Sequence, residues 1–505
     1  MSEIGKRLAQ LPADEIREII YRPQLTQVDG DDFKAMLDLN KAHLVMLAEC
    51  GLIDAATARQ LAQALLKMSV TGLDVQPDAG AVDTLLEDAY FAFETRLAAV
   101  AGTHAAGTLH LARSRNDIGA TLDRMRARSY ALRIAEGLLE VRSQCVTRAF
   151  DYTELILPGY THLQPAQPIS FAYYLSGYET ALERDSQRLV TAAAGMDECA
   201  LGVAALAGSG FAIDRRRTAQ LLGFEGITRH GLDTVASRDF MLELLSAVNL
   251  LGVTWSRIAQ DFHVFVSDEF AVLELPDRVS GISSIMPQKK NPIALEFLKA
   301  QSARITGALM GSITAVRGTH FSVSLDAMRE GLADGWAVLK NTPAHLSLLR
   351  LVMESVAPRA QALEDRCNRN FSTATDLADA LVRHCGLSFR EAHHIVGGAV
   401  RLALQLGRDA TGIDAALLDQ AAQSEIGKPL GLPDALIAQC RDARQALLQR
   451  TTPGGAAPSA VLETLRESQR RLQQTREQLA ARRQTLAQAD AALESALQAV
   501  AANGR

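Results

Sequence analysis

Hydrophobic residues between positions 234 and 266 recur at the spacing of one face of an α-helix. Their positions step by 4, 3, 4, 3 and 4 residues: Leu244, Val248, Leu251, Trp255, Ile258 and Phe262. Such steps place the side chains in one stripe along the helix. A helix from Thr234 to Val266 would be about 50 Å long at a rise of ~1.5 Å per residue. Gly252 is its one weak point.

The distribution of proline extends this pattern. No proline lies between Pro77 and Pro158 or between Pro168 and Pro276, although the chain contains 15. A proline inside a helix costs about 3 kcal/mol, so both stretches can form long helices. Long helices bury their apolar stripes against partners of similar length. The pattern therefore predicts an all-α fold built around a central bundle of long helices.

Three polar segments interrupt the helical pattern. They span residues 110–123, 158–168 and 276–292, and prolines bracket the second and third. Irregular loops carried by a rigid scaffold are where binding and catalytic residues concentrate. We therefore expect the functional residues in these segments.

The last 45 residues repeat leucine every seven positions. Residues 451–459, TTPGGAAPS, predict a turn or linker, and the leucines that follow are Leu465, Leu472, Leu479, Leu486 and Leu493. The second core position of this heptad is mostly polar, so the stripe is half of a coiled-coil seam. The tail is either an amphipathic helix that lies on its own protein or a separate oligomerisation helix.

Composition excludes several classes of function. A chain of 505 residues predicts two to three domains; 48% of the residues are hydrophobic, 22% are charged, and the net charge is −6. This balance gives no reason to expect binding to nucleic acid or to an acidic membrane. The six cysteines form no CxxC pair, which argues against a zinc site or a disulfide framework. With no signal-peptide pattern and no apolar run of ~18 residues, we expect a cytoplasmic protein without a membrane span.

The segment from Ser283 to Pro292, SSIMPQKKNP, carries the most chemical information. It combines hydroxyl groups, two ammonium groups and an amide in a loop stiffened by proline. No base lies beside Ser283 in the sequence, so a hydrolase triad is not indicated. A deprotonated hydroxyl can take a proton from the carbon next to a carboxylate, while the cation and the amide stabilise the doubly charged carboxylate that forms.

The stretch GISSIMPQKKNP, residues 281–292, looks like the signature loop of the fumarase/aspartase superfamily in its argininosuccinate lyase form. Other segments resemble that family in the same order: HLARSRND (110–117, family HTGRSRND), PGYTHLQPAQP (158–168, its histidine loop), LAGSGFAIDRRRTAQLLGF (206–224), SRDFMLELLSA (237–247) and ATDLADALVRHCGLSFREAHHIVG (374–397). The resemblance covers about residues 30–465. Together these motifs are highly specific, because no accident of spacing produces all of them in order.

The resemblance implies the catalytic residues. Ser283 corresponds to the base that removes the Cβ proton of an N-substituted aspartate. Lys289 and Asn291 correspond to groups that hold the resulting aci-carboxylate. His162 corresponds to the histidine that assists departure of the nitrogen, and Glu296 to the carboxylate that orients this histidine.

Further residues correspond to substrate ligands or lie close to them. The expected ligands are Ser114, Asn116, Thr161, Ser284 and Met286. Arg115 is either a ligand or a residue that orders its loop. Arg329 can pair with an anionic leaving group, because a guanidinium matches a carboxylate well.

The family also implies an architecture of three helical domains and a homotetramer. Its central helices form a tetrameric helical core, and each active site draws residues from three subunits. We expect an N-terminal helical domain over 1–113, a central long-helix domain over 114–364, a C-terminal helical domain over 365–459 and a helical tail over 460–505. The partners are a small-molecule substrate and fumarate, and no metal or organic cofactor is expected.

Several positions depart from the argininosuccinate lyase pattern. The tyrosine, glutamine and lysine of the family segment YNKDLQEDK fall on Val323, Met328 and Gly331. A serine of the N-terminal helix and the histidine of EDxH fall on Asn40 and Tyr90. A leaving group that bears a guanidinium would lose polar partners at such a site.

Three functions therefore remain open. The first is argininosuccinate lyase, which releases arginine and fumarate. The second is a carbon–nitrogen lyase that cleaves another N-substituted aspartate by β-elimination to fumarate plus an amine, such as an aminopolycarboxylate of the ethylenediamine-disuccinate (EDDS) type. The third is a non-catalytic structural protein like the lens crystallins of the family. The retained Ser283, Lys289, Asn291 and His162 argue against the third.

Overall fold

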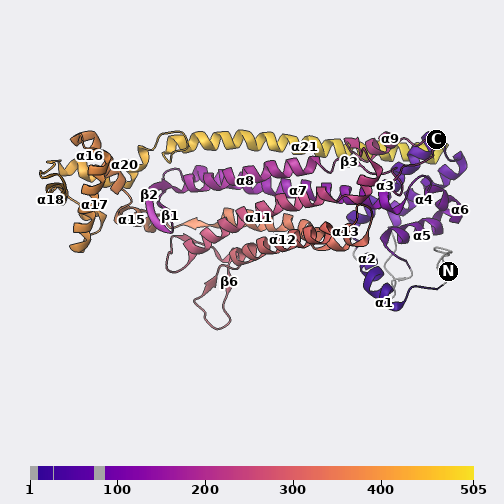
Figure 1. The fold of residues 1–505 in the computed structure, drawn as a ribbon, viewed down its shortest axis with the longest axis horizontal. Helices are drawn as coiled ribbons and strands as arrows, with labels where there is room; N and C mark the ends of the chain where they lie inside the picture. The colour runs from indigo at the N-terminus through magenta and orange to yellow at the C-terminus, as the bar shows by residue number, and fades with distance from the viewer. Residues whose placement is uncertain (1–9, 27, 73–85, 505) are drawn as a thin grey trace.

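The long helices of the chain lie side by side and form an elongated bundle with a group of shorter helices at each end (Figure 1). This computed structural model describes residues 10–26, 28–72 and 86–504. The bundle helices are α7 (Arg115–Asp151), α8 (Phe171–Ala194), α11 (Asp239–Val266), α12 (Ile293–Arg317) and α14 (Ala333–Ser355). The predicted all-α fold is confirmed, because the strands in the described residues form only short pairs between helices.

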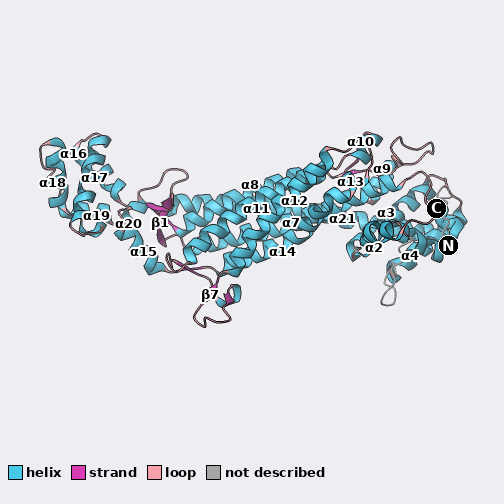
Figure 2. Ribbon diagram, turned by 60° about the horizontal axis from the view of Figure 1, so that its bottom comes forward, coloured by secondary structure: helices cyan, strands magenta, loops and turns pink. Residues whose placement is uncertain are grey.

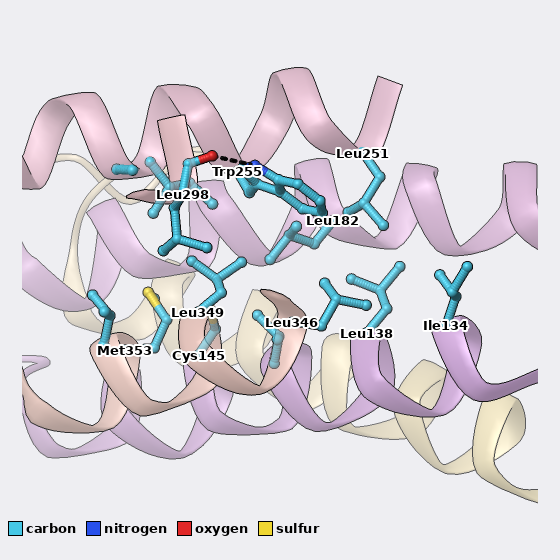
Figure 3. Packing of buried hydrophobic residues seen from close by; sticks show 14 of the residues in the cluster. Ile134, Leu138, Cys145, Leu182, Leu251, Trp255, Leu298, Leu346, Leu349 and Met353 are labelled. Carbon is cyan, nitrogen blue, oxygen red and sulfur yellow. Dashed lines mark hydrogen bonds between the residues drawn. The ribbon is translucent and has the colours of Figure 1, made fainter. Parts of the chain in front are cut away.

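The predicted apolar stripe lies in the core of the bundle. All six of its residues are at most 1% exposed. Trp255 packs among leucines of the neighbouring helices, and its indole Nε1 donates to the carbonyl oxygen of Leu298 at 3.0 Å (Figure 3). Burying an aromatic ring together with its polar atom requires such a partner. The stripe therefore packs α11 against α12, α8 and α14.

The predicted helix from Thr234 to Val266 is interrupted near its start. Residues Gly231–Ala236 form a separate short helix, α10, and Ser237 is extended. The side chain of Arg238 is 1% exposed and donates to the carbonyl oxygens of Val235 and Ser237 and to Asp123 of α7. The break gives this buried guanidinium its acceptors. The spacing of hydrophobic residues alone could not predict this break.

The N-terminal end of the bundle collects helices from distant parts of the chain. They are α1 (Asp14–Ile16), a π-helical turn (Arg17–Tyr21), α2 (Arg22–Thr26), α3 (Gly30–Glu49), α4 (Ala55–Thr71), α5 (Ala89–Ala101), α6 (Thr103–Leu109), α9 (Arg215–Leu221), α10, α13 (Leu325–Met328) and a 3-10 turn (Glu330–Leu332). The hydrophobic core of this end includes Leu201, Phe224 and Leu497 as well as residues of α3 and α4. The segment after α8 and the tail therefore complete this core.

The opposite end carries a group of short helices with its own core. They are α15 (Ala360–Arg369), α16 (Ala374–Cys385), α17 (Phe389–Gln405), a 3-10 turn (Ala410–Gly412), α18 (Ala415–Ile426), α19 (Asp434–Arg441) and α20 (Ala443–Leu448). Domain limits at residues 113, 364 and 459 stay a proposal.

Four short strand pairs connect the helices (Figure 2). The antiparallel pairs are β1 (Ile156–Thr161) with β2 (Gln164–Ser170), β5 (Leu273–Glu274) with β8 (Ala357–Pro358), and β6 (Gly281–Ile282) with β7 (Lys290–Asn291). The parallel pair is β3 (Glu198–Cys199) with β4 (Gly226–Ile227). A 3-10 turn, Asp277–Val279, lies between β5 and β6. None of the helices in the described ranges has the length and apolar character needed to cross a membrane.

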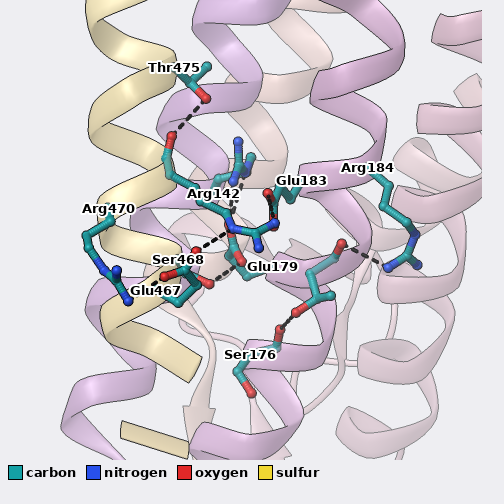
Figure 4. A network of polar contacts seen from close by, with 11 residues as sticks. Arg142, Ser176, Glu179, Glu183, Arg184, Glu467, Ser468, Arg470 and Thr475 are labelled. Atoms are coloured by element: carbon teal, nitrogen blue, oxygen red, sulfur yellow. Dashed lines mark hydrogen bonds and ion pairs between the residues drawn. The ribbon is translucent and has the colours of Figure 1, made fainter. Parts of the chain in front are cut away.

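The C-terminal tail is one helix, α21 (Pro458–Asn503), which runs along the bundle to the N-terminal end. Leu465 and Leu472 are buried against the bundle, and Leu493 is buried in the N-terminal core. A buried network of Arg142, Glu179 and Ser468 joins the tail to α7 and α8 (Figure 4). The first interpretation of the tail, an amphipathic helix packed on its own protein, is confirmed.

Candidate active site

The predicted histidine loop, residues 158–168, forms most of the β1–β2 hairpin and its turn. Thr161 pairs with Gln164, so His162 and Leu163 form a two-residue turn. Both have positive φ, +56° and +57°, as a type I′ turn requires. Non-glycine residues hold this conformation at a cost of order 1–3 kcal/mol each, which typically marks a functional site. All three of Thr161, His162 and Leu163 are exposed, and His162 makes no hydrogen bond within the described part of the chain.

The signature loop projects from the bundle between β6 and β7 (Figure 1, Figure 2). The backbone N–H of Met286 donates to Ser283 Oγ at 3.0 Å, and Asn291 Nδ2 donates to the carbonyl oxygen of Ile282 at 3.4 Å. The side chain of Ser284 is exposed, like most of the loop, and Ile282 is 89% exposed. The loop therefore presents its polar groups, and apolar ones beside them, away from its own chain.

The two lysines of this loop differ in their contacts. Lys290 Nζ lies 2.9 Å from Asp277 and 3.8 Å from Glu274. Lys289 is exposed, and its ammonium has no partner among the described residues. Lys289 is therefore the cation of the loop that is available to a bound carboxylate.

Glu296 lies in the first turn of α12 and is exposed. Within the described residues it makes no hydrogen bond to His162. Its neighbour is His263 of α11, which accepts a hydrogen bond from Lys299 Nζ at Nδ1, at 2.7 Å. Burial and Lys299 lower the pKa of His263, and Glu296 opposes them. Sequence reasoning missed His263 and Lys299, because neither lies in a recognisable motif.

Ser114, Arg115 and Asn116 lie where α7 begins. Ser114 is the N-cap, and its Oγ accepts from the backbone N–H of Asn116 at 3.3 Å. Arg115 Nη1 lies 2.9 Å from Glu87 and 3.1 Å from Asp88, and its guanidinium stacks on the ring of Phe91. These contacts support the second interpretation of Arg115, a residue that orders its loop.

Asp117 was not singled out by sequence reasoning, although it closes the same helix cap. Its carboxylate is fully buried and accepts from the backbone N–H groups of Ser114, Gly202 and Ala204, at 2.8, 2.8 and 2.9 Å. Asn116 Nδ2 donates to the carbonyl oxygen of Ala205 at 3.0 Å. The segment after β3 is therefore fixed against the start of α7.

Arg329 lies near the same end of the bundle, just after α13. Its Nε donates to Glu330 at 3.0 Å, whereas its buried Nη2 has no partner among the described residues. Arg329 and Arg115 both lower the pKa of Tyr21, although burial and Glu87 raise it on balance. The two guanidinium groups therefore lie in one neighbourhood.

Gly331 occupies a position that no side chain could fill. A Cβ there would lie 2.6 Å from the carbonyl oxygen of Asp326 and 2.7 Å from the Cβ of Ala315. Met328 packs beside Gly119, one turn along α7 from Asn116. The backbone of this segment is therefore incompatible with the lysine of the family pattern.

Two other departures compensate each other. The Tyr90 hydroxyl donates to Asn40 Oδ1 at 2.9 Å, and both side chains are buried. Burial raises the pKa of Tyr90 to about 12. The pair is a packed hydrogen bond of the N-terminal core and does not face a substrate.

The predicted site residues occupy separate places on one chain. Ser114 precedes the 37 residues of α7 and the β1–β2 hairpin follows them, a separation of about 55 Å at ~1.5 Å per residue. Met328 packs beside Gly119 of α7, so Arg329 lies near the start of that helix. The β1–β2 hairpin, which carries Thr161 and His162, lies at the other end of the bundle, and the loop after β6 projects from the side (Figure 1). One chain does not bring these groups together. Across the described ranges, no three His, Cys, Asp or Glu side chains gather as a metal site.

Comparisons with known proteins place the chain among lyases. The family described as Lyase matches residues 18–307, and the one described as Argininosuccinate lyase C-terminal matches residues 371–439. "Argininosuccinate lyase 1" of Shouchella clausii is 36% identical over 97% of this chain and 96% of its own length. Argininosuccinate lyase of Methanosarcina acetivorans is 33% identical over 99% of both chains. This length includes the tail, so the limit near residue 465 expected from motifs was too short.

Solved structures agree with this assignment. EDDS lyase in complex with formate superposes with a TM-score of 0.86 at 28% identity, over 97% of this chain and 96% of that chain. An EDDS lyase variant with bound fumarate gives the same TM-score and identity, over 98% and 97%. The 3-carboxy-cis,cis-muconate lactonizing enzyme of Pseudomonas putida shares the fold, with a TM-score of 0.69 at 19% identity over 91% and 98%.

Proposed function

Because the chain belongs to the argininosuccinate lyase family of the fumarase/aspartase superfamily, we propose that it cleaves an N-substituted aspartate whose leaving amine carries a carboxylate. The family makes the chain a carbon–nitrogen lyase that releases fumarate. The proposal concerns the identity of the amine that leaves. The alternative substrate is argininosuccinate, whose leaving amine is arginine. An aminopolycarboxylate of the EDDS type fits the proposed class.

The observation that carries the proposal is the segment around Arg329. In ungapped register the guanidinium stands where the family segment has a glutamate, and one of its N–H groups is buried without an acceptor. A buried, unpaired donor on a charged group is costly, and a carboxylate relieves the cost. The guanidinium of argininosuccinate would instead meet a like charge.

The reaction that we propose is a β-elimination. Ser283, as the alkoxide, removes the Cβ proton of the aspartate moiety, and the N–H of Met286 at 3.0 Å stabilises negative charge on its Oγ. Lys289 and Asn291 bind the carboxylate that takes up the carbanion charge. The carbon–nitrogen bond then breaks, its electrons leave with the nitrogen, and His162 assists the departing amine with a proton. The remaining four carbons are fumarate.

We also propose that a homotetramer assembles the site. The support is the wide separation of Ser114, His162 and Ser283 along one rigid bundle. Exposed apolar side chains on α11 and α12, such as Val253 and Met310, are 45% and 55% exposed and offer a surface for other copies. In such an assembly Ser114, Asn116, Thr161, Ser284 and Met286 would contact substrate, and Glu296 would orient a histidine from another subunit.

The substrate is tested with Arg329→Ala. Fumarate release from an EDDS-type substrate and from argininosuccinate gives a ratio of kcat/KM. We expect the variant to lower this ratio at least about fivefold, since a close charge contact is worth on the order of 1 kcal/mol even in a wet site. Arg408→Ala, at an exposed arginine of the C-terminal group that pairs with Asp414, is the matched control. If wild type cleaved argininosuccinate efficiently and Arg329→Ala did not change that rate, argininosuccinate would be the substrate.

A further inference from the structure

A hollow of about 300 Å³ opens in the segment to which the candidate substrate ligand Asn116 is hydrogen-bonded. The segment between β3 and α9 forms most of it, and Val203, Ser209, Phe211, Ile213 and Arg215 line it. Asn116 donates to Ala205, two residues along the chain from Val203. The hollow and the substrate-binding end of α7 therefore share one piece of backbone.

This wall is held in a fixed place by Asp117. Its buried carboxylate accepts from Gly202 and Ala204, and Ala204 is in the left-handed region with φ +53°. A non-glycine residue keeps this conformation only when its surroundings enforce it. The carboxylate contributes that constraint and ties this part of the wall to the cap of α7.

The lining combines polar groups with one apolar side. The guanidinium of Arg215 donates to the carbonyl oxygens of Cys199, Leu201 and Thr228 and to the Thr228 hydroxyl, so most of its N–H groups already have acceptors within the chain. Val203, Phe211 and Ile213 contribute hydrocarbon surface, and Phe211 is 50% exposed. This apolar side of the hollow favours contact with methylene groups.

We propose that the hollow receives the methylene-rich part of the leaving amine, with Phe211 as its specificity-determining contact and Asp117 as the positioning residue of its wall. The inference rests on the proposed function and extends it to the length of the amine. A substrate of this class carries a carboxylate for Arg329 and a hydrocarbon chain for the hollow.

The test uses N-substituted aspartates whose leaving amines are glycine, 4-aminobutyrate and 6-aminohexanoate, followed by fumarate release from the full-length protein. All three keep the amine's carboxylate. We expect kcat/KM to rise with chain length, and Phe211→Ala to lower it about tenfold or more for 6-aminohexanoate but less than about threefold for glycine. Phe389→Ala, at an exposed phenylalanine of α17 that is 54% exposed, should change none of them.

Asp117→Asn tests the positioning role. It keeps one acceptor oxygen but sets an amide N–H against backbone donors, so we expect KM to rise for the longest amine while kcat is largely retained. Protease cleavage within residues 202–213 should increase at the same time. A fall in kcat that is equal for all three amines would show a merely structural role for Asp117, and the Phe211→Ala series then decides the inference.

The outcomes separate the two proposals. An equal effect of Phe211→Ala on all three amines overturns the hollow as a subsite and leaves the proposed function standing. Release of fumarate from argininosuccinate alone overturns the proposed function and this inference together.

Discussion

Single residues show which departures from the family concern the substrate and which concern packing. Tyr90 and Asn40 satisfy each other in a buried core, so their change needs no functional explanation. Gly331 has no room for a Cβ, and Arg329 beside it keeps an unpaired N–H. Sequence could identify these positions by comparison with a pattern, but it could not separate the two kinds, because only the contacts distinguish a compensated pair from an open site.

Replacing the proposed base should abolish turnover without preventing binding. Because Ser283 is the proposed proton acceptor, Ser283→Ala should lose at least ~10³ in kcat, about 4 kcal/mol of barrier. Fumarate release measures the loss, and equilibrium binding of the substrate should persist. Gln288→Ala, at an exposed position of the same loop, is the control and should stay active. A Ser283→Ala enzyme with a tenth of the normal activity would reduce the serine to a ligand.

His43 should make stability depend on pH. It is fully buried, its Nε2 donates to the carbonyl oxygen of Leu111 at 2.9 Å, and its buried Nδ1 has no partner in the described residues, so a proton added there would have no acceptor. Burial, with Arg113 and His110 nearby, holds the pKa of His43 well below its usual range. Below pH ~6.5 the unfolded chain therefore binds a proton at this histidine that the folded chain does not bind. The free energy of unfolding then falls by up to about 1.4 kcal/mol for each unit by which the pH is lowered.

The measurement is the unfolding free energy of wild type and His43→Gln between pH 7 and pH 5. Glutamine keeps a side-chain donor for Leu111 but does not titrate. The slope should be shallower in the variant, and parallel curves would show that His43 does not contribute.

Secondary-structure elements were predictable where their hydrophobic residues repeat at one regular spacing. The buried stripe on α11 was predicted from steps of three and four residues, and the proline-free stretches predicted where the long helices lie. The break at Ser237 was not predictable, because it serves the buried Arg238, which pairs with the distant Asp123. The positive φ of His162 was also hidden, since no glycine marks that turn. The contact of Ser468 on α21 with the buried Arg142–Glu179 pair was not predictable either, because the heptad pattern does not record it.

The network under the tail should be the strongest polar link between α21 and the bundle. Arg142 and Glu179 are fully buried, with 2.8 Å between Arg142 Nη2 and Glu179 Oε1, and the Ser468 hydroxyl donates to the other carboxylate oxygen at 2.6 Å. Glu179→Leu leaves the guanidinium buried and unpaired and should cost about 3–5 kcal/mol. Adding Arg142→Met should restore most of that stability, because no charge then remains buried.

Urea unfolding of the single and double variants measures this coupling. The matched control is Glu136 with Arg483, an exposed pair that joins α7 to the same tail helix, α21. Breaking it should cost less than ~1 kcal/mol. A Glu179→Leu variant as stable as wild type would mean that the tail docks by its leucines alone.

At the scale of the whole molecule, the chain holds all the proposed catalytic groups but keeps them apart. The motifs near residues 114, 161 and 283 were recognisable in sequence as separate loops, and their order along the chain already implied long helices between them. Their distances could not be read from sequence. The structure shows an extended bundle with Ser114 at one end and His162 at the other, and a projecting loop that exposes Ile282 and Ile285. Such exposed apolar residues favour contact with another copy.

Mixing two inactive variants tests whether the site is shared between subunits. If His162 and Ser283 reach one site from different subunits, random hybrids of His162→Ala and Ser283→Ala chains hold both native side chains in about a quarter of their sites, and roughly that fraction of the activity should return. A mixture of His162→Ala with Thr161→Ala is the control. Both residues belong to one hairpin, so no site regains both and the activity should not rise above the average of the two unmixed variants. Subunit exchange is verified beforehand with differently tagged chains. If exchange occurs and the first mixture stays as inactive as the second, each site is built within one chain, and the separation of its motifs must then be closed by movement of that chain.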